Sequence, residues 1–353
     1  MNNKNLPLTI ETGKWRGGHI QGIAMDREKG YIYCSFTTEL VKLDLCGNVI
    51  GSVKGFTGHL GCLAMGPDGR IYGSLEYKND SIGRDILNLL GIENEIKNAF
   101  YIAVFDGDKI DSLDMDAEKG GIMKTVWLKE PTEDYLYETA EKKHRYACSG
   151  IDGITFAPAF EGEGTRVYVA YGIYGDNTRD DNDYQVLLCY DPKELVKYEA
   201  ILAADNIHSS GPEKAENRYF VYTGNTTFGV QNMEYDESTG NIFMAVYRGR
   251  KEKFKNHNLF LVDTSKGVRT ELLKGMDGEY GKVLSLAESN IYEEEHGIYS
   301  YEFKYGSTGM ISLGDGYFYI SEPRQADGEY ESTIRLYKLT GKGFPAFAAV
   351  TEE

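Results

Sequence analysis

Residues 18–36 read GHIQGIAMDREKGYIYCSF, and from Gly58 the chain returns to nearly the same phrase, GHLGCLAMGPDGRIYGSL. Each phrase has the form of a β-hairpin: a short alternating apolar run, a turn rich in Asp and Gly, and a second alternating run. Related phrases occur as GITFA at Gly153, NMEYD at Asn232 and MISLG at Met310. The hairpin is therefore the first half of a unit that occurs five times.

Each unit continues with a third alternating run, and a fourth, less regular run leads into the next unit. The third runs begin at Glu39, Phe100, Tyr184, Asn258 and Ser332, and the fourth runs are VIGSVKGF, IMKTVWL, YEAILAA, VRTELL and FPAFAAV. Four strands in each of five units predict an all-β fold, a five-bladed β-propeller with four-stranded antiparallel blades, because stacked blades bury faces that one sheet leaves open. We expect residues 1–353 to form this single domain, with the N-terminal segment LPLTIETGKW pairing with the last blade to close the ring.

The connections between strands indicate where a ligand should bind. Insertions fall mainly between second and third strands, at 77–99, 172–183, 248–256 and 323–331, and before the next innermost strand. In a propeller both kinds of loop lie around one mouth of the central channel. Long loops on one face of a repeat array usually mark the binding face. The sequence thus predicts a ligand site at that mouth.

One insertion has the pattern of a helix. Within residues 85–98, the apolar side chains Ile86, Leu89, Leu90 and Ile96 recur at roughly helical spacing. We expect a helix here, and the sequence leaves open whether it packs on the propeller rim, covers the mouth as a lid or contacts a second copy of the chain.

Composition limits the class of partner. A formal net charge of −17 argues against nucleic acid or an anionic membrane surface, because a phosphate surface attracts a basic footprint. No apolar run approaches the roughly 20 residues that span a bilayer, and the first residues lack the features of a secretory signal. The five cysteines form no C-x-x-C pair, so we expect reduced thiols and a cytoplasmic protein. The oligomeric state stays open.

The blade repeat, a short innermost strand followed by an acidic turn and an I/V-Y strand, resembles that of gluconolactonase/regucalcin-like and NHL-like β-propellers. The resemblance covers most of the chain, with a loose motif. It implies that single residues beside the innermost strands converge on a divalent cation in the channel, where the family has Glu, Asn and Asp. The matching positions are Gln21, Asp152 and Gln231. With one carboxylate and two amides, they predict at most a weak site for Ca²⁺ or another divalent cation.

Polar residues predicted at the mouth favour a small-molecule ligand. The candidate ligand-binding residues are His19, Gln21, His59, Asp152, Gln231, Asn232, Arg248, Thr308, Glu322 and Arg324. Amides and hydroxyls both donate and accept hydrogen bonds, as recognition of a sugar or another polyol requires. We therefore expect a ligand-binding propeller that recognises a small polar or carbohydrate-like molecule. The alternatives are a metal-dependent hydrolase or lactonase, a glycosidase-like enzyme and a protein-interaction scaffold.

Three further patterns suggest chemistry at the same mouth. The basic run 248–258, with Arg324, has the charge to hold an anionic group. The acidic loop 176–183 alternates carboxylates and amides as calcium loops do, but lacks their glycine and distal Glu. Glu76 and Glu322 end second strands and could pair for glycoside chemistry. No H-E-x-x-H or G-x-S-x-G motif occurs, so the catalytic residues, if any, are unknown.

Overall fold

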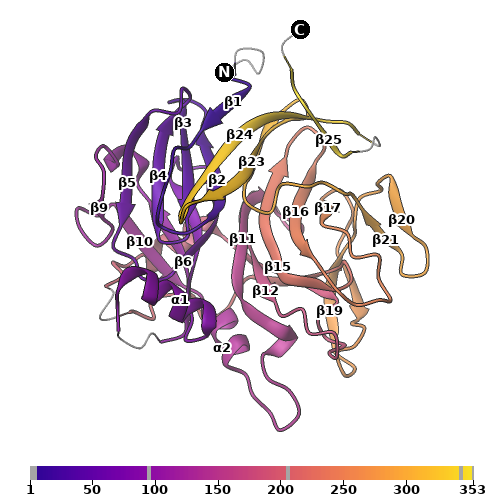
Figure 1. Ribbon diagram of the computed structural model, residues 1–353. Helices are drawn as coiled ribbons and strands as arrows, with labels where there is room; N and C mark the ends of the chain where they lie inside the picture. Colours follow the sequence, from indigo (N-terminus) through magenta and orange to yellow (C-terminus); the bar gives the residue numbers. More distant parts are fainter. Residues whose placement is uncertain (1–5, 94–96, 204–206, 342–344, 352–353) are drawn as a thin grey trace.

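Five antiparallel sheets are arranged around a central axis, as the computed structural model in Figure 1 shows. The structure describes residues 6–93, 97–203, 207–341 and 345–351. The innermost strands are β2 (Ile20–Asp26), β6 (His59–Met65), β11 (Cys148–Pro158), β15 (Thr226–Asp236) and β22 (Met310–Gly314). Each packs against the next, and β22 returns to β2. The expected five-bladed β-propeller is confirmed.

The outer strands complete the blades. Blade 1 adds β3 (Tyr31–Phe36), β4 (Glu39–Asp44), β5 (Val49–Lys54) and, at its edge, β9 (Met115–Asp116). Blade 2 adds β7 (Ile71–Tyr77), β8 (Ala99–Phe105) and β10 (Met123–Trp127). Blade 3 adds β12 (Thr165–Ile173), β13 (Tyr184–Tyr190) and β14 (Asn217–Tyr222). Blade 4 adds β16 (Asn241–Arg248) and β17 (Leu259–Asp263). Blade 5 adds β23 (Tyr317–Ala326), β24 (Glu329–Leu339), β1 (Thr9–Glu11) and β25 (Phe347–Ala349).

Two expected fourth strands lie elsewhere. The run VRTELL contains β18 (Arg269–Leu272), which pairs with β19 (Tyr280–Leu284), and β19 extends the outer edge of blade 3 in parallel with β14. The run YEAILAA contains no strand in its described part, and β14 takes the place expected for it. Blade 4 is instead flanked by the hairpin of β20 (Ile291–Glu293) and β21 (Ile298–Ser300). An alternating run predicts a strand but not the sheet edge that it joins.

The two ends of the chain meet in blade 5. Strands β1 and β24, coloured indigo and yellow in Figure 1, lie side by side, with Ile10 opposite Ile334. Ile10 is 1% exposed and belongs to the apolar cluster between blades 5 and 1. The N-terminal segment therefore closes the ring as expected, because it covers the edge that β24 would otherwise present to solvent.

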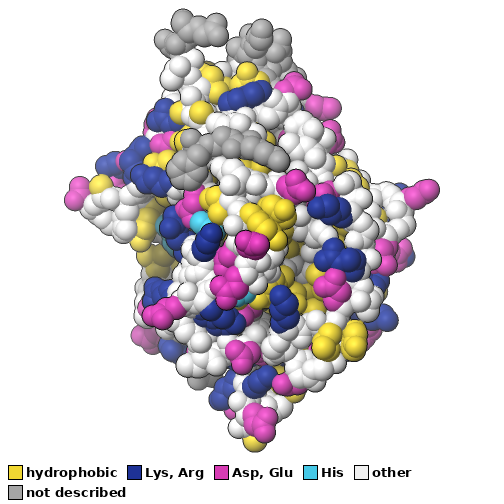
Figure 2. Space-filling view, turned by 90° about the vertical axis from the view of Figure 1, so that its right-hand side faces the viewer, with side chains coloured by type: hydrophobic (Ala, Val, Ile, Leu, Met, Phe, Trp, Pro, Cys, Tyr) yellow, Lys and Arg dark blue, Asp and Glu magenta, His cyan; other side chains and the backbone are white. Residues whose placement is uncertain are grey.

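The apolar core is divided among the blade interfaces. Five clusters of buried side chains lie between neighbouring blades, one for each interface around the ring. All five cysteines are free thiols, of which Cys46 alone is exposed. Charged side chains are spread over the surface: in the view of Figure 2, Lys and Arg side chains are interspersed with Asp and Glu. The negative net charge therefore does not gather into a single acidic patch on that face.

Helices are few and lie in the connections: α1 (Ser81–Leu90), α2 (Lys129–Leu136) and α3 (Pro192–Leu195). Among the described residues, no helix is long and apolar enough to cross a membrane. Helix α1 lies in the insertion expected at 85–98, but it begins and ends earlier, and residues 94–96 lie outside the described residues. Its limits have a local cause. Asp80 caps the first turn by accepting from the N–H of Gly83, and Gly91 takes the left-handed conformation that ends the helix.

Candidate functional site

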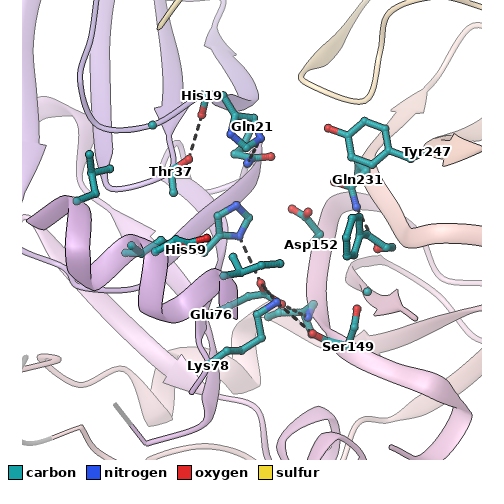
Figure 3. A pocket seen from close by; sticks show the side chains of 18 of the residues that line it. His19, Gln21, Thr37, His59, Glu76, Lys78, Ser149, Asp152, Gln231 and Tyr247 are labelled. Carbon is teal, nitrogen blue, oxygen red and sulfur yellow. Dashed lines mark hydrogen bonds and ion pairs between the residues drawn. The ribbon is translucent and has the colours of Figure 1, made fainter. Parts of the chain in front are cut away.

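A cavity of about 480 Å³ lies at the mouth of the channel where the innermost strands begin (Figure 3). The starts of β2, β6, β11 and β15 form its floor, and the ends of β7 and β16 contribute to its sides. Helix α1 supplies an apolar wall with Ile82, Ile86 and Leu89. The long connection between β7 and β8 therefore covers part of the mouth that the sequence predicts as the binding face.

Three polar side chains reach this cavity from irregular positions in the innermost strands. In β2, Ile20 pairs with Phe36 and Gly22 with Ser35, so Gln21 is an extra residue in the ladder. The same register shift occurs at Asp152 in β11 and at Gln231 in β15. Such β-bulges turn a side chain away from the regular alternation of the strand. The three positions given by the family resemblance thus share one backbone feature and line one cavity.

The corresponding bulge in β6 carries Gly61, which leaves room for Asp152. A methyl group added at Gly61 would lie 2.1 Å from Oδ1 of Asp152. That oxygen accepts a hydrogen bond from the N–H of Cys62 at 3.3 Å. The carboxyl group is 7% exposed and points into the middle of the cavity (Figure 3). The absent side chain in blade 2 therefore lets the carboxyl group from blade 3 occupy the mouth.

The variant Gly61→Ala is expected to lower the free energy of unfolding by about 1–3 kcal/mol, because overpacking at a filled position forces neighbouring groups to move. Urea unfolding measures this change. Gly267→Ala is the control, since a methyl group there meets no atom within 4 Å. The close packing of Gly61 and Asp152 also predicts partial recovery in the double variant Gly61→Ala, Asp152→Ala. Equal losses in the Gly61 and Gly267 variants would contradict this account of the floor.

Glu76 and Lys78 form a buried ion pair in the cavity wall. Nζ of Lys78 lies 2.8 Å from Oε2 of Glu76 and donates to the carbonyl oxygen of Ser149 at 3.1 Å. Oε1 of Glu76 accepts from the N–H of Ile151 at 2.7 Å, and Nδ1 of His59 lies 3.3 Å from Oε2. Both charges are therefore satisfied within the protein.

The ionisation of these groups follows from their contacts. Burial alone would raise the pKa of Glu76, but Lys78 and His59 hold that pKa below its usual value. Burial alone would lower the pKa of Lys78, but Glu76 and Asp80 raise it. Burial raises the pKa of Asp152 to about 7, although the positive charges of His59 and Lys78 oppose the rise. The carboxyl group of Asp152 thus changes its charge near neutral pH.

The structure brings half of the predicted ligand-binding residues to the cavity: His19, Gln21, His59, Asp152 and Gln231. Asn232 and Thr308 are buried beside it without lining it. The Asn232 amide donates to the carbonyl oxygens of Gln21 and Ser307, and the Thr308 hydroxyl contacts that of Ser321. Asn232 thus joins β15 to β2 and to the segment before β22, and Thr308 contacts β23 of its own blade.

The three remaining predicted residues do not line the cavity and have partners within the protein. Arg248 pairs with Glu302, and Arg324 pairs with Glu11 and Glu331. Glu322 accepts hydrogen bonds from Arg335 and Tyr337. Glu76 therefore lines the cavity without Glu322, so the structure does not place these two carboxylates together for glycoside chemistry.

The basic run and the acidic loop bind each other. Nζ of Lys251 is buried and contacts Asn182 and Asp183, at 2.6 Å and 2.5 Å, and Lys253 also pairs with Asp183. Arg179 pairs with Asp181 inside the loop. These ion pairs join blades 3 and 4, and they take up the charges that the sequence offered to an anion or a cation.

Several cavity residues have no clear sequence signal. Lys78 follows an apolar strand and gives no sign that it turns inward to Glu76. Ile82 begins the apolar face of α1, but its position depends on where the Asp80 cap starts the helix. Phe228 and Tyr330 reach the rim from blades 4 and 5. The periodicity of α1 indicated an apolar face, while only the fold shows that this face borders the cavity.

The cavity fits a divalent cation poorly. Asp152 provides one carboxylate, while the amide of Gln231 donates to the carbonyl oxygen of Phe228 at 3.0 Å and the amide of Gln21 is hydrogen-bonded to His19. Ca²⁺ takes six to eight oxygen ligands and binds weakly where charged oxygens are few. In the described part of the chain, no group of three or more His, Cys, Asp or Glu side chains is arranged to hold a metal ion.

Comparison with known proteins finds solved structures with a similar fold and no related sequence family. No protein-family model and no curated protein sequence matches the chain. Among solved structures, the aldose sugar dehydrogenase of Streptomyces coelicolor with bound PQQ is 11% identical, with a TM-score of 0.34 and coverage of 93% of this chain and 98% of that one. The soluble aldose sugar dehydrogenase of Escherichia coli is 10% identical, with a TM-score of 0.39 over the same shares.

A protein assigned as a gluconolactonase is also similar, with 12% identity and a TM-score of 0.36 over 90% of this chain and 74% of that one. It represents the family whose blade repeat the sequence resembles. At this identity and these TM-scores, the likeness does not establish a shared function.

Proposed function

We propose that this protein binds a small polar, carbohydrate-like molecule in the cavity at the channel mouth. The observation that supports the proposal is the convergence of Gln21, Asp152 and Gln231 on one cavity from three bulged innermost strands. Ligand sites are typically concave and mostly apolar, with a few well-placed polar groups. The volume of about 480 Å³ falls within the usual range for small-molecule sites.

The rim also suits a ring-shaped ligand. Phe228, Tyr247 and Tyr330 line the cavity together with the amides. Aromatic rings bury large areas at little conformational cost, and the Tyr hydroxyl adds a polar group. The enzymatic alternatives find less support, because glycoside hydrolysis uses two facing carboxylates and Glu76 is already paired with Lys78.

Binding of glucose, xylose and myo-inositol, measured by calorimetry and by saturation-transfer NMR, tests this proposal. The variants Gln21→Ala and Gln231→Ala should each weaken binding about tenfold, because each removes a hydrogen-bonding group worth about 1–1.5 kcal/mol. Gln325→Ala is the matched control, since this glutamine is exposed on blade 5 outside the cavity. If none of the three probes binds, or if the cavity variants bind as tightly as the control, the proposal is wrong.

A further inference from the structure

We propose that the ligand carries a protonated amino group that pairs with Asp152 and an apolar body that lies along helix α1. This inference rests on the proposed function, that the cavity binds a small polar molecule, and narrows that molecule to an organic ammonium ion. It is argued from the hydrogen-bonding state of the polar wall, from the exposure of the opposite wall and from the charge balance of the cavity.

Asp152 is a buried carboxyl group that the described residues do not neutralise. Its one hydrogen bond there comes from the N–H of Cys62, at 3.3 Å, and it has no ion pair. The amino group of Lys78 lies 2.8 Å from Glu76, and His59 also faces Glu76, so both are paired with a carboxylate other than Asp152. An ionised carboxylate with so few partners is costly to bury. A cationic ligand would supply the missing charge.

The two amides present the matching atoms. The nitrogen of Gln231 donates to Phe228, and the nitrogen of Gln21 is hydrogen-bonded to His19. Each amide nitrogen keeps a second N–H, and the two amide oxygens are acceptors beside the free oxygen of Asp152 in the lining of the cavity. An ammonium group has three donors and no acceptor. The two amide oxygens and the Asp152 carboxylate can accept all three of its N–H groups, and the carboxylate alone among them also supplies the opposite charge.

The opposite wall is apolar and partly open to solvent. Ile82, Ile86 and Leu89 lie one above the other on α1, at the spacing of residues on one helix face. Leu89 is 51% exposed and Ile82 36%. Covering such surface contributes roughly 25 cal/mol per Å². A ligand with a hydrocarbon face therefore gains more from this wall than a fully hydroxylated one.

The charge of Asp152 gives binding a distinctive pH dependence. The ionisable groups around it are His59 and Cys62 on β6, Glu76 and Lys78 at the end of β7, Asp85 on α1, Tyr247 on β16 and His19 before β2. With the pKa of Asp152 at about 7 in the free protein, an ammonium ion must displace the proton at lower pH. Affinity should fall about tenfold for each pH unit below that value and level off above it.

The test compares cyclohexylamine, cyclohexanol and methylamine by calorimetry between about pH 5 and pH 8, alongside the neutral sugars. Wild-type protein should bind cyclohexylamine at least tenfold more tightly than cyclohexanol near pH 8. Asp152→Asn should abolish this preference and its pH dependence while every other ionisable group stays in place. Asp85→Asn, which removes a second carboxylate of the cavity, should keep both. Ile82→Ser should weaken cyclohexylamine at least threefold and leave methylamine unchanged.

The outcomes separate the two proposals. Sugars that bind through Gln21 and Gln231, without a preference for cyclohexylamine over cyclohexanol, overturn the ammonium inference and leave the proposed function standing. A preference that survives Asp152→Asn, or that is lost in Asp85→Asn, also overturns it. If the amines bind and no sugar does, the carbohydrate-like ligand is wrong and the ammonium inference stands. If neither the amines nor the sugars bind wild-type protein, both proposals fail.

Discussion

The variant Lys78→Met is expected to lower the free energy of unfolding by about 3–5 kcal/mol, since removing one partner of a buried ion pair leaves the other charge uncompensated. Lys78 is 7% exposed and Glu76 5%. Methionine fills a similar volume but cannot pair with the carboxylate or donate to Ser149. Denaturant unfolding near pH 7, followed by circular dichroism, measures the loss.

Two controls isolate the charge. Lys129→Met breaks the surface contact with Glu213, whose side chain is 87% exposed, and should cost no more than about 1 kcal/mol. The double variant Lys78→Met, Glu76→Gln should be more stable than Lys78→Met alone, because no lone charge stays buried. A loss below about 1 kcal/mol in Lys78→Met would show that water screens the pair.

The Glu76–Lys78 ion pair also predicts how the stability difference between Lys78→Met and wild type changes with pH. The folded-state pKa of Glu76 lies below its usual value because of Lys78 and His59, against the effect of burial. A carboxylate of this kind contributes stability above its unfolded-state pKa, and the contribution is lost as the pH falls through the folded-state value. Since Lys78→Met removes much of that contribution, the gap between variant and wild type should narrow in acid.

The variant Asp152→Asn should have the opposite effect and stabilise the free protein by about 2–4 kcal/mol near pH 8, because each unit of pKa shift corresponds to about 1.4 kcal/mol. Burial raises the folded-state pKa of Asp152 to about 7. The folded protein therefore holds this proton more tightly than the unfolded chain. Stability falls as the pH rises from the usual aspartate range to about 7, and it is constant above. Asparagine has no proton to lose there.

Thermal and urea unfolding at several pH values measure this gain. The gain should be small at about pH 4 and complete near pH 8. Asp85→Asn is the control, since it removes another carboxyl group of the cavity, one that is exposed. A variant that is less stable than wild type at both ends of the range would contradict the assignment of Asp152 as a costly, unneutralised group. A stabilised variant that no longer prefers amines would be a trade of binding for stability.

The sequence predicted the repeat and the ring closure because both rest on local patterns. Alternation and turn residues identify the hairpin at residues 18–36. The N-terminal run has no partner within its own unit, which indicates that it pairs with the edge of the last blade. The pairing partner of each strand was harder to predict than the strand itself. The residues of β18 alternate as a strand of blade 4 would, yet they pair with β19 on blade 3. Which edge accepts a short strand depends on packing between blades, and no single run carries that information.

The residues of the candidate site also divide into those that the sequence could predict and those that it could not. Gln21, Asp152 and Gln231 could be found because their positions repeat along the chain, and the β-bulges explain why those positions face inward. Arg248 and Arg324 do not line the cavity, and the sequence does not show this because Glu302 and Glu11, with which they pair, lie far from them along the chain. A basic residue in a loop near the channel mouth is available to a ligand only when no carboxylate of the protein already pairs with it.

The closure of blade 5 also governs how the molecule can assemble. A hydrogen bond from Ser332 to the hydroxyl of Thr12 joins residues 320 positions apart. Bringing such distant segments together carries a loop-closure cost before any contact compensates for it, so pairings of this kind form slowly. The innermost strands of the first four blades follow one another along the chain, whereas the pairing of β24 with β1 needs nearly the whole chain in place. We therefore expect the pairing of the two chain ends to form late in folding.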